Sequence, residues 1–149
     1  MLAALVAWVA VRAGWDWLRW WRQAPERATL DRLWDRLLDT GVEVVRLQER
    51  LDAKERALHA DDAHLRAWPG FDDAAAVAAY NRLVRQRNRM AAEVNALRRE
   101  RQRALLRYQA LQDSVQAVAA RLGEPWFPVP LPAEAAARRG ALDTLGDRP

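Results

Sequence analysis

The sequence predicts an all-α protein with an N-terminal membrane-associated helix, a long antiparallel coiled-coil hairpin and a Pro-rich extended tail. Three observations favour this fold class. An apolar, Trp-rich segment opens the chain, two long stretches repeat apolar residues every seven positions, and a cluster of prolines follows the second stretch. The length of 149 residues fits one ordinary domain.

The first segment, residues 1–23, is expected to form a helix that associates with a membrane or docks on a partner. Residues 1–11 are all apolar, but a spanning helix needs about 20 apolar residues and charges begin at Arg12. Three interpretations remain open: a helix lying in the interfacial plane, a span whose charges face a partner protein, or a buried helix of a soluble bundle. The anchor candidates are Leu2, Leu5, Trp8, Val9, Trp15, Trp17, Trp20 and Trp21.

The charges around this segment predict its orientation. Positive charge follows the apolar run, at Arg12, Arg19, Arg22 and Arg27, whereas a cleavable secretory signal carries it before the run. A spanning segment of this pattern would leave the bulk of the protein on the cytoplasmic side. We therefore expect a membrane-associated protein that keeps this segment.

Residues 24–122 are predicted to form the hairpin. Pro25 suits the first turn of a new helix, so the first arm is expected over residues 28–66. Its apolar residues recur every seven positions, which is the spacing of a coiled-coil seam. The seam residues of this arm are Leu30, Leu37, Val44, Leu51, Leu58 and Leu65.

A turn at residues 68–71, which contains Pro69 and Gly70, separates the two arms. Asp72 or Asp73 is the expected N-cap of the second arm, residues 73–122, and Gly123 is its expected C-terminal cap. The seam residues of the second arm are Leu83, Met90, Val94, Leu97 and Leu111.

The two arms carry opposite net charge. Residues 24–79 contain eight basic and twelve acidic residues, whereas residues 80–122 contain ten basic and three acidic ones. Folding about the Pro-Gly turn would bring Asp52 near Arg87 and Asp39 near Arg101. Because an exposed ion pair contributes only about 0–1 kcal/mol, such pairs would select the register while the apolar seam supplies the stability.

The second arm also offers an alternative function, because nine arginines lie within residues 82–107. Arginines presented outward would bind phosphate groups in a salt-dependent and sequence-independent manner, on nucleic acid or on acidic lipid. The candidates for an anionic partner are Arg82, Arg85, Arg89, Arg98, Arg99, Arg103 and Arg107.

Two short stretches of this arm resemble known families. Residues 88–101, NRMAAEVNALRRER, resemble the basic region of leucine-zipper transcription factors, with Ala96 in the place of that family's arginine. Residues 80–90 are similar to the helix that follows the membrane anchor in LemA family proteins. We carry no function over from either resemblance.

A row of amide side chains accompanies the seam of the second arm. The row would either hydrogen-bond to a neighbouring helix and fix its register or form a solvated flank. Its members recur every seven residues, at Asn81, Asn88, Asn95, Gln102, Gln109 and Gln116.

The tail, residues 123–149, begins with GEPWFPVPLP. Its prolines forbid a helix and favour an extended arm, with Trp126 and Phe127 as apolar contact residues. The arm would dock in a groove of another subunit or cover the end of its own hairpin. A short helix is expected over residues 133–139.

Catalytic chemistry is not expected. The chain has no cysteine, one serine, Ser114, and two histidines, His59 and His64, whose spacing of five does not match a helical metal pair. We predict no catalytic, cofactor-binding or metal-binding residues and no small-molecule substrate. Asp61, Asp62, Asp72 and Asp73 are better explained by capping and solvation than by a cation.

The expected function is that of a non-catalytic, membrane-anchored scaffold or accessory subunit of a larger complex. Two antiparallel rods bury only one stripe per helix, so we expect other subunits or a second copy as partners. The alternative is a binding module whose basic helix holds nucleic acid or anionic lipid.

Overall fold

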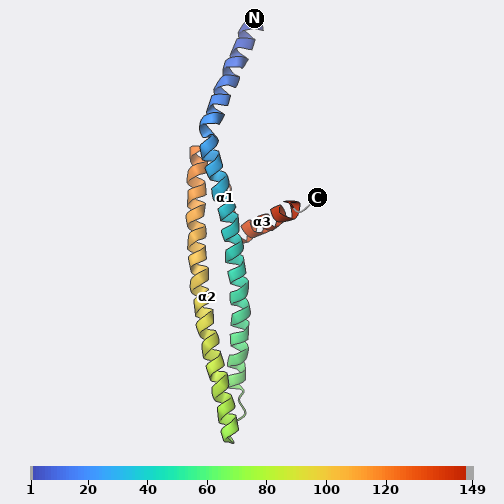
Figure 1. Cartoon of the computed structure of the whole chain (residues 1–149), viewed down its shortest axis with the longest axis vertical. Helices are drawn as coiled ribbons and strands as arrows, with labels where there is room; N and C mark the ends of the chain where they lie inside the picture. Colours follow the sequence, from blue (N-terminus) through green and yellow to red (C-terminus); the bar gives the residue numbers. More distant parts are fainter. Residues whose placement is uncertain (1, 147–149) are drawn as a thin grey trace.

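The computed structural model describes the backbone of residues 2–146 and the side chains of residues 23–144. Within this range the chain forms three helices, α1 (Leu2–Arg66), α2 (Ala74–Arg121) and α3 (Pro132–Gly146), and no strand. α1 and α2 lie side by side in opposite directions, and α3 packs against α1 (Figure 1). The predicted all-α class and helical hairpin are confirmed.

α1 is one unbroken helix of 65 residues, so the boundary expected at residues 24–25 is absent and Pro25 lies inside the helix. A proline inside a helix lacks the amide proton of the helical hydrogen bond and crowds the preceding turn, so it bends the helix. Pro25 therefore bends α1 and does not start a new helix. The ribbon changes direction in its blue portion (Figure 1). α1 therefore connects the N-terminal segment to the hairpin without a linker.

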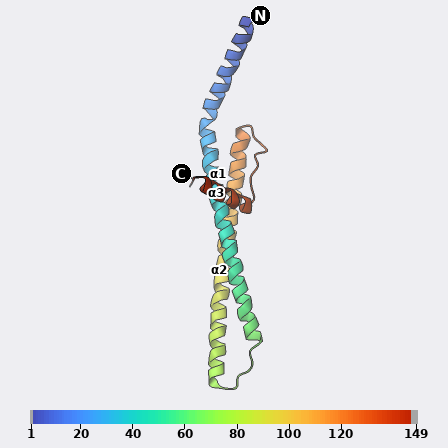
Figure 2. The ribbon, with the colours of Figure 1, turned by 90° about the vertical axis from the view of Figure 1, so that its right-hand side faces the viewer.

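The N-terminal part of α1 extends beyond the hairpin. Arg121, the last residue of α2, pairs with Glu26 of α1. The part of α1 that precedes Glu26 has no other helix beside it (Figure 2). At 1.5 Å per residue, residues 2–25 form an arm about 36 Å long. The side chains of the anchor candidates between Leu2 and Trp21 lie outside the described part of the chain.

Both ends of α2 are capped by the residues that the sequence predicts. The side chain of Asp73 accepts a 2.7 Å hydrogen bond from the backbone N–H of Ala76. After the C-cap Leu122, Gly123 adopts a positive φ of 89°, and the N–H of Glu124 donates to the carbonyl of Ala119 at 2.9 Å. Glycine takes this left-handed conformation without strain, so α2 ends in a Schellman motif.

The connection between α1 and α2 is longer than the expected four-residue turn and covers residues 67–73. It lies against the first turns of α2, because the rings of Trp68 and Phe71 meet Tyr80 at centroid distances of 5.5 and 4.9 Å. The indole Nε1 of Trp68 also donates to the carbonyl of Gly70. As a result α2 begins beyond the end of α1 (Figure 2).

This connection shifts the register of the hairpin, and the expected ion pairs are wrong. Arg87 pairs with Asp62 at 2.7 Å, ten residues further along α1 than the expected Asp52. Arg101 does not pair with Asp39, which instead contacts Arg139 of α3. A tight Pro-Gly turn would have started α2 level with the end of α1, whereas the extended connection carries its first turns past that end.

The apolar seam forms two clusters along the hairpin, one in the middle and one near α3. The middle cluster consists of Val44, Leu47, Leu51, Val94, Leu97 and Ala104, with Leu58 and Leu105 packed against it. The cluster near α3 consists of Leu37, Leu38, Tyr108 and Ala135, with Trp34, Leu111 and Val129 beside it. The second cluster therefore joins all three helices and the segment that precedes α3.

The tail folds back on the hairpin. Residues 123–131 are not helical, and α3 then runs from Pro132 to Gly146, longer than the expected 133–139. Pro132 at the first position supplies the right φ and lacks only an N–H that a helix start leaves unbonded. The Glu134 carboxylate accepts from the N–H of Leu131 at 3.1 Å, which caps this start.

Candidate functional site

Three surfaces of the described molecule offer side chains to a partner: a pocket between α1 and α3, the Pro-rich segment before α3, and the outer face of α2. Apart from Leu111, which also lines a groove between the two helices, the seam residues take no part in them, because they lie in the α1–α2 contact. Leu37, Val44, Leu51, Val94 and Leu97 are buried there, and Leu30, Leu58, Leu65, Leu83, Met90 and Leu111 are half-buried.

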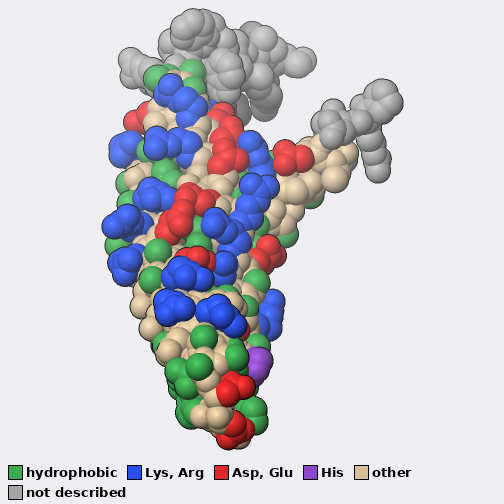
Figure 3. Space-filling model, turned by 60° about the horizontal axis from the view of Figure 1, so that its bottom comes forward, with side chains coloured by type: hydrophobic (Ala, Val, Ile, Leu, Met, Phe, Trp, Pro, Cys, Tyr) green, Lys and Arg blue, Asp and Glu red, His purple; other side chains and the backbone are tan. Residues whose placement is uncertain are grey.

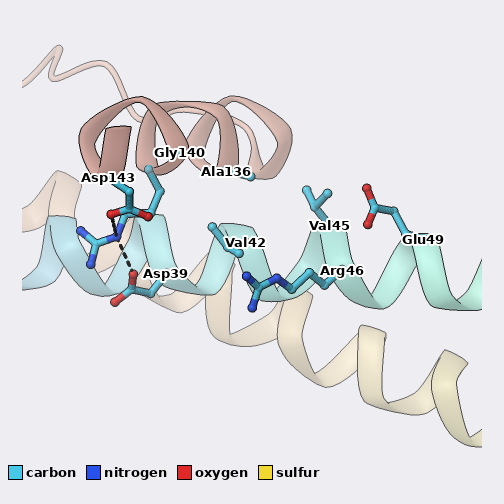
Figure 4. Close-up of a pocket in the computed structure, with 9 residues that line it drawn as sticks. Asp39, Val42, Val45, Arg46, Glu49, Ala136, Gly140 and Asp143 are labelled. Carbon is cyan, nitrogen blue, oxygen red and sulfur yellow. Dashed lines mark ion pairs between the residues drawn. The ribbon is translucent and has the colours of Figure 1, made fainter. Parts of the chain in front are cut away.

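The pocket between α1 and α3 has a volume of about 610 Å³ (Figure 4). Val42 and Val45 of α1 and Ala136 and Gly140 of α3 form its apolar surface. The surrounding charged residues are Asp39, Arg46, Glu49, Arg139 and Asp143.

Arg139 connects the two helices beside this pocket. Its guanidinium lies 3.0 Å from Asp39 and 3.5 Å from Asp35 of α1, and 3.9 Å from Asp143 of its own helix. The guanidinium is therefore already surrounded by carboxylates. We interpret the pocket as the margin of the α1–α3 contact, because Arg139 is occupied in holding α3 to α1 and Arg46 is exposed at its edge.

The Pro-rich segment is held to the hairpin by its backbone carbonyls. Tyr108 and Gln112 both donate to the carbonyl of Pro130, at 2.8 and 3.1 Å, and Gln116 donates to that of Pro125 at 2.6 Å. A proline carbonyl is a normal acceptor, so these bonds do not depend on the missing N–H groups. In this chain the segment covers its own hairpin.

The two tail-docking candidates have different surroundings. Phe127 packs edge-on against Trp34 of α1 at a centroid distance of 5.3 Å, and the guanidinium carbon of Arg138 lies over the Trp34 ring, 5.9 Å from its centroid. Trp126 is 91% exposed. Phe127 therefore belongs to the internal packing, and only Trp126 is presented to solvent.

The outer face of α2 carries a continuous row of arginines and alanines. Positions 82, 85, 89, 92, 96, 99 and 103 follow alternating steps of three and four, which places them on one face of the helix. Arg82, Arg85, Arg89, Arg99 and Arg103 are all exposed, and we call these five residues the basic face. Lys and Arg side chains gather on the side of the hairpin seen in Figure 3.

The basic face is free of internal ion pairs. Among residues 23–144, none of its five arginines lies within salt-bridge distance of a carboxylate. The other two candidates of the sequence differ, because Arg98 pairs with Glu55 and Arg107 pairs with Glu43, each at 2.6 Å. The hairpin thus uses two of the seven candidate arginines for its own register and leaves five for solvent.

A groove between α1 and α2 continues the basic face toward the C-terminal end of α2. It encloses about 480 Å³ and lies between Arg36 of α1 and Arg107 of α2. Leu33 and Leu111 form its apolar floor, and Thr40 and Ser114 contribute hydroxyls that donate to carbonyls of their own helices. Arg36 is exposed and adds a cation from α1 to the same side.

Ion pairs perturb the ionisation of two carboxylates in the hairpin. The hydrogen bond from Arg87 lowers the pKa of Asp62 below its ordinary value, and the same contact raises the pKa of Arg87. Lys54, 2.6 Å from Glu93, lowers the pKa of that carboxyl. Both contacts stabilise the charged forms and join α1 to α2.

The amide row and the two histidines lie mostly in solvent. Asn81, Asn88, Asn95, Gln102 and Gln109 of the amide row are exposed, and Gln116 binds the tail instead of a neighbouring helix. His59 and His64 are exposed on α1. No group of three or more His, Asp or Glu side chains that could hold a metal ion occurs in the described residues.

Within the part of the chain that the structure describes, no helix has a stretch long and apolar enough to cross a membrane. No protein-family model, curated protein or solved structure matches the chain.

Sequence reasoning missed the division of the candidate arginines into paired and unpaired sets among the described residues. This division follows from the register, which places Glu43 and Glu55 beside Arg107 and Arg98. The one signal in the sequence is that Arg82, Arg85, Arg89, Arg99 and Arg103 follow steps of three and four residues. This spacing places them on a helix face other than that of the seam residues.

Proposed function

We propose that this protein is a non-catalytic scaffold or accessory subunit that attaches to a membrane through the N-terminal arm of α1. The observation that carries the proposal is the continuity of α1, which joins an apolar, Trp-rich segment to a two-helix hairpin in a single element. A force or contact at one end of such a helix is transmitted to the other without a flexible linker. This is the property that a spacer or scaffold needs.

The composition of the arm supports an interfacial attachment. Eleven apolar residues are followed by tryptophans interleaved with arginines and an aspartate. Helices of this kind lie in the plane of the interface, with tryptophan near the headgroups and arginine in water. We propose that residues 2–22 lie on the membrane in this way and that the hairpin holds the partner subunits.

Flotation on neutral phosphatidylcholine vesicles tests the attachment. In the full chain, Leu5→Glu together with Val9→Glu places two charges in the apolar run and is expected to abolish flotation. The matched control is Ala57→Glu with Ala60→Glu, which adds the same charge at two exposed positions of α1 and should float like the unmodified protein. Equal flotation of all three proteins would overturn the proposal.

The partner contact is expected at Trp126, the most exposed large apolar residue in the described range. Its chain neighbours are held in place, because Gln116 donates to the carbonyl of Pro125 and Phe127 packs on Trp34, so the backbone that presents the indole is already ordered. We expect Trp126→Ala to reduce the size of the native, detergent-extracted complex measured by gel filtration. Leu106→Ala, also at an exposed residue, should leave that size unchanged.

A further inference from the structure

We propose that the basic face of α2 lies on an anionic lipid surface, so that the hairpin rests along the membrane and does not stand away from it. The inference rests on the proposed attachment of the N-terminal arm and names the second membrane contact of the same molecule. The basic face consists of Arg82, Arg85, Arg89, Arg99 and Arg103.

The first support is the geometry of the row. Its steps of three and four keep the five arginines on one side of α2 over a length of about 32 Å at 1.5 Å per residue. Ala92 and Ala96, which are both exposed, occupy the middle of the row. Their short side chains do not project between the arginines, so the guanidinium groups on either side can reach a flat surface. Arginine side chains extend their charge toward phosphate while their apolar stems stay near the helix.

The second support is the absence of competing partners. In the described residues, Arg98 and Arg107 are neutralised by Glu55 and Glu43, but the basic face has no carboxylate within salt-bridge distance. Glu93 and Glu100 are the acidic residues of α2 beside this row, and Glu93 is paired with Lys54, so the five arginines keep a net positive charge on the face. Arg36 of α1 adds another cation at the groove that continues the row.

The third support favours a lipid surface over single-stranded nucleic acid. The row contains only arginine and alanine, whereas proteins that grip single strands add aromatic side chains on which bases stack. α1 also continues without a break from the Trp-rich arm into the hairpin. An arm lying in the interfacial plane therefore keeps the hairpin within reach of the headgroups, where a row of cations is attracted to acidic lipid.

Vesicle binding tests the basic face with a charge-matched pair of variants. Arg82→Gln, Arg89→Gln and Arg103→Gln together remove three cations from the face. Arg46→Gln, Arg56→Gln and Arg66→Gln remove three exposed cations from α1. On vesicles containing phosphatidylserine, each arginine near the surface is worth about fivefold in binding, so the first variant should lose about a hundredfold and the second much less.

The same variants separate this inference from the proposed attachment. On neutral phosphatidylcholine vesicles the triple variant of the basic face should bind like the unmodified protein, whereas Leu5→Glu with Val9→Glu should not bind. Equal binding of both triple variants to acidic vesicles would overturn the basic-face proposal and leave the anchor intact. Loss of neutral-vesicle binding only in the anchor variant supports the attachment independently.

A site-specific probe tests the orientation, because the chain has no cysteine of its own. An environment-sensitive dye on Ala92→Cys, in the middle of the basic face, should shift to the blue with acidic vesicles. The same dye on Ala137→Cys, an exposed position of α3, should not shift. A shift of the dye at position 137 alone would overturn the proposal. It would also be overturned if the protein bound a DNA or RNA duplex more tightly than acidic vesicles and the triple variant of the basic face lost that duplex binding.

Discussion

Gly41 of α1 lies so close to Ala135 of α3 that a Cβ on Gly41 would stand 2.6 Å from the Cβ of Ala135. The same Cβ would also lie 3.0 Å from the backbone carbonyl oxygen of Pro132. Neither neighbour is a flexible side-chain end, so α3 can pack here only because residue 41 has no side chain. This contact is where the third helix meets the hairpin.

Gly41→Ala is expected to loosen or displace α3, although alanine is the better helix former by about 1 kcal/mol. Because the clash involves a Cβ and backbone, we expect a net loss of stability and faster hydrogen exchange in residues 132–146. Gly140→Ala is the control, since nothing lies within 4 Å of its Cβ, and it should raise the melting temperature. Equal exchange of α3 in the two variants would contradict this contact.

Tyr108 should titrate late. Burial, with a smaller contribution from Glu134, raises the pKa of Tyr108 to about 12 from its ordinary 10. The unfolded chain then loses this proton first, so the contribution to stability is complete below pH 10 and is lost as the pH rises toward 12. Absorbance at high pH should show a late phenolate step that disappears in Tyr108→Phe.

The same substitution also tests how the tail is held. Tyr108→Phe removes the hydrogen bond to the carbonyl of Pro130 but leaves the one from Gln112, so we expect a loss of about 1 kcal/mol in unfolding free energy. Gln112→Ala combined with Tyr108→Phe leaves a buried carbonyl without these donors and should cost more than the sum of the single changes. Additive effects would indicate that the two donors act separately.

Cross-linking distinguishes the observed register from the tight-turn register. With no native cysteine, a short bis-maleimide should join Lys54→Cys to Glu93→Cys, because Nζ and Oε2 of the original residues are 2.6 Å apart. Asp52→Cys with Arg87→Cys should not react, since Arg87 lies beside Asp62. Preferential cross-linking of the 52–87 pair would contradict the register.

Arg101 lies seven residues after the seam residue Val94 and is half-buried, which destabilises the hairpin. Its Nε is buried and has no hydrogen-bond partner among the described residues, and an unsatisfied buried donor costs about 1–3 kcal/mol. Arg101→Met keeps the length and helix propensity of the side chain without that donor, so it should raise the unfolding midpoint in urea. Arg87→Met, which breaks the pair with Asp62, should lower it.

The sequence predicted the helices better than their arrangement. The caps at Asp73 and Gly123 follow from short-range chemistry, and the structure contains both. Pro25 was misinterpreted as a helix start, because proline at a first turn and proline inside a bent helix look alike in sequence. The ion pairs of Arg87 and Arg101 were wrong because the connection's packing on Tyr80 is a tertiary contact.

For the candidate surfaces too, the sequence shows the residue pattern and the tertiary structure decides which residues are available to a partner. The arginine pattern of α2 is visible in the sequence, but only the register shows that Arg98 and Arg107 are neutralised by α1. Likewise Trp126 and Phe127 are adjacent and both aromatic, and only the fold turns one toward Trp34 and the other to solvent.

By itself the sequence determined two long helices with a heptad repeat, both ends of α2 and the opposite charge of the two arms, because periodicity and capping act over a few residues. The tertiary structure decided the register, the docking of α3 on Gly41 and the set of arginines left unpaired. These depend on contacts between residues up to about a hundred positions apart, such as Gly41 with Ala135, whose free energies are individually small and collectively select one alignment.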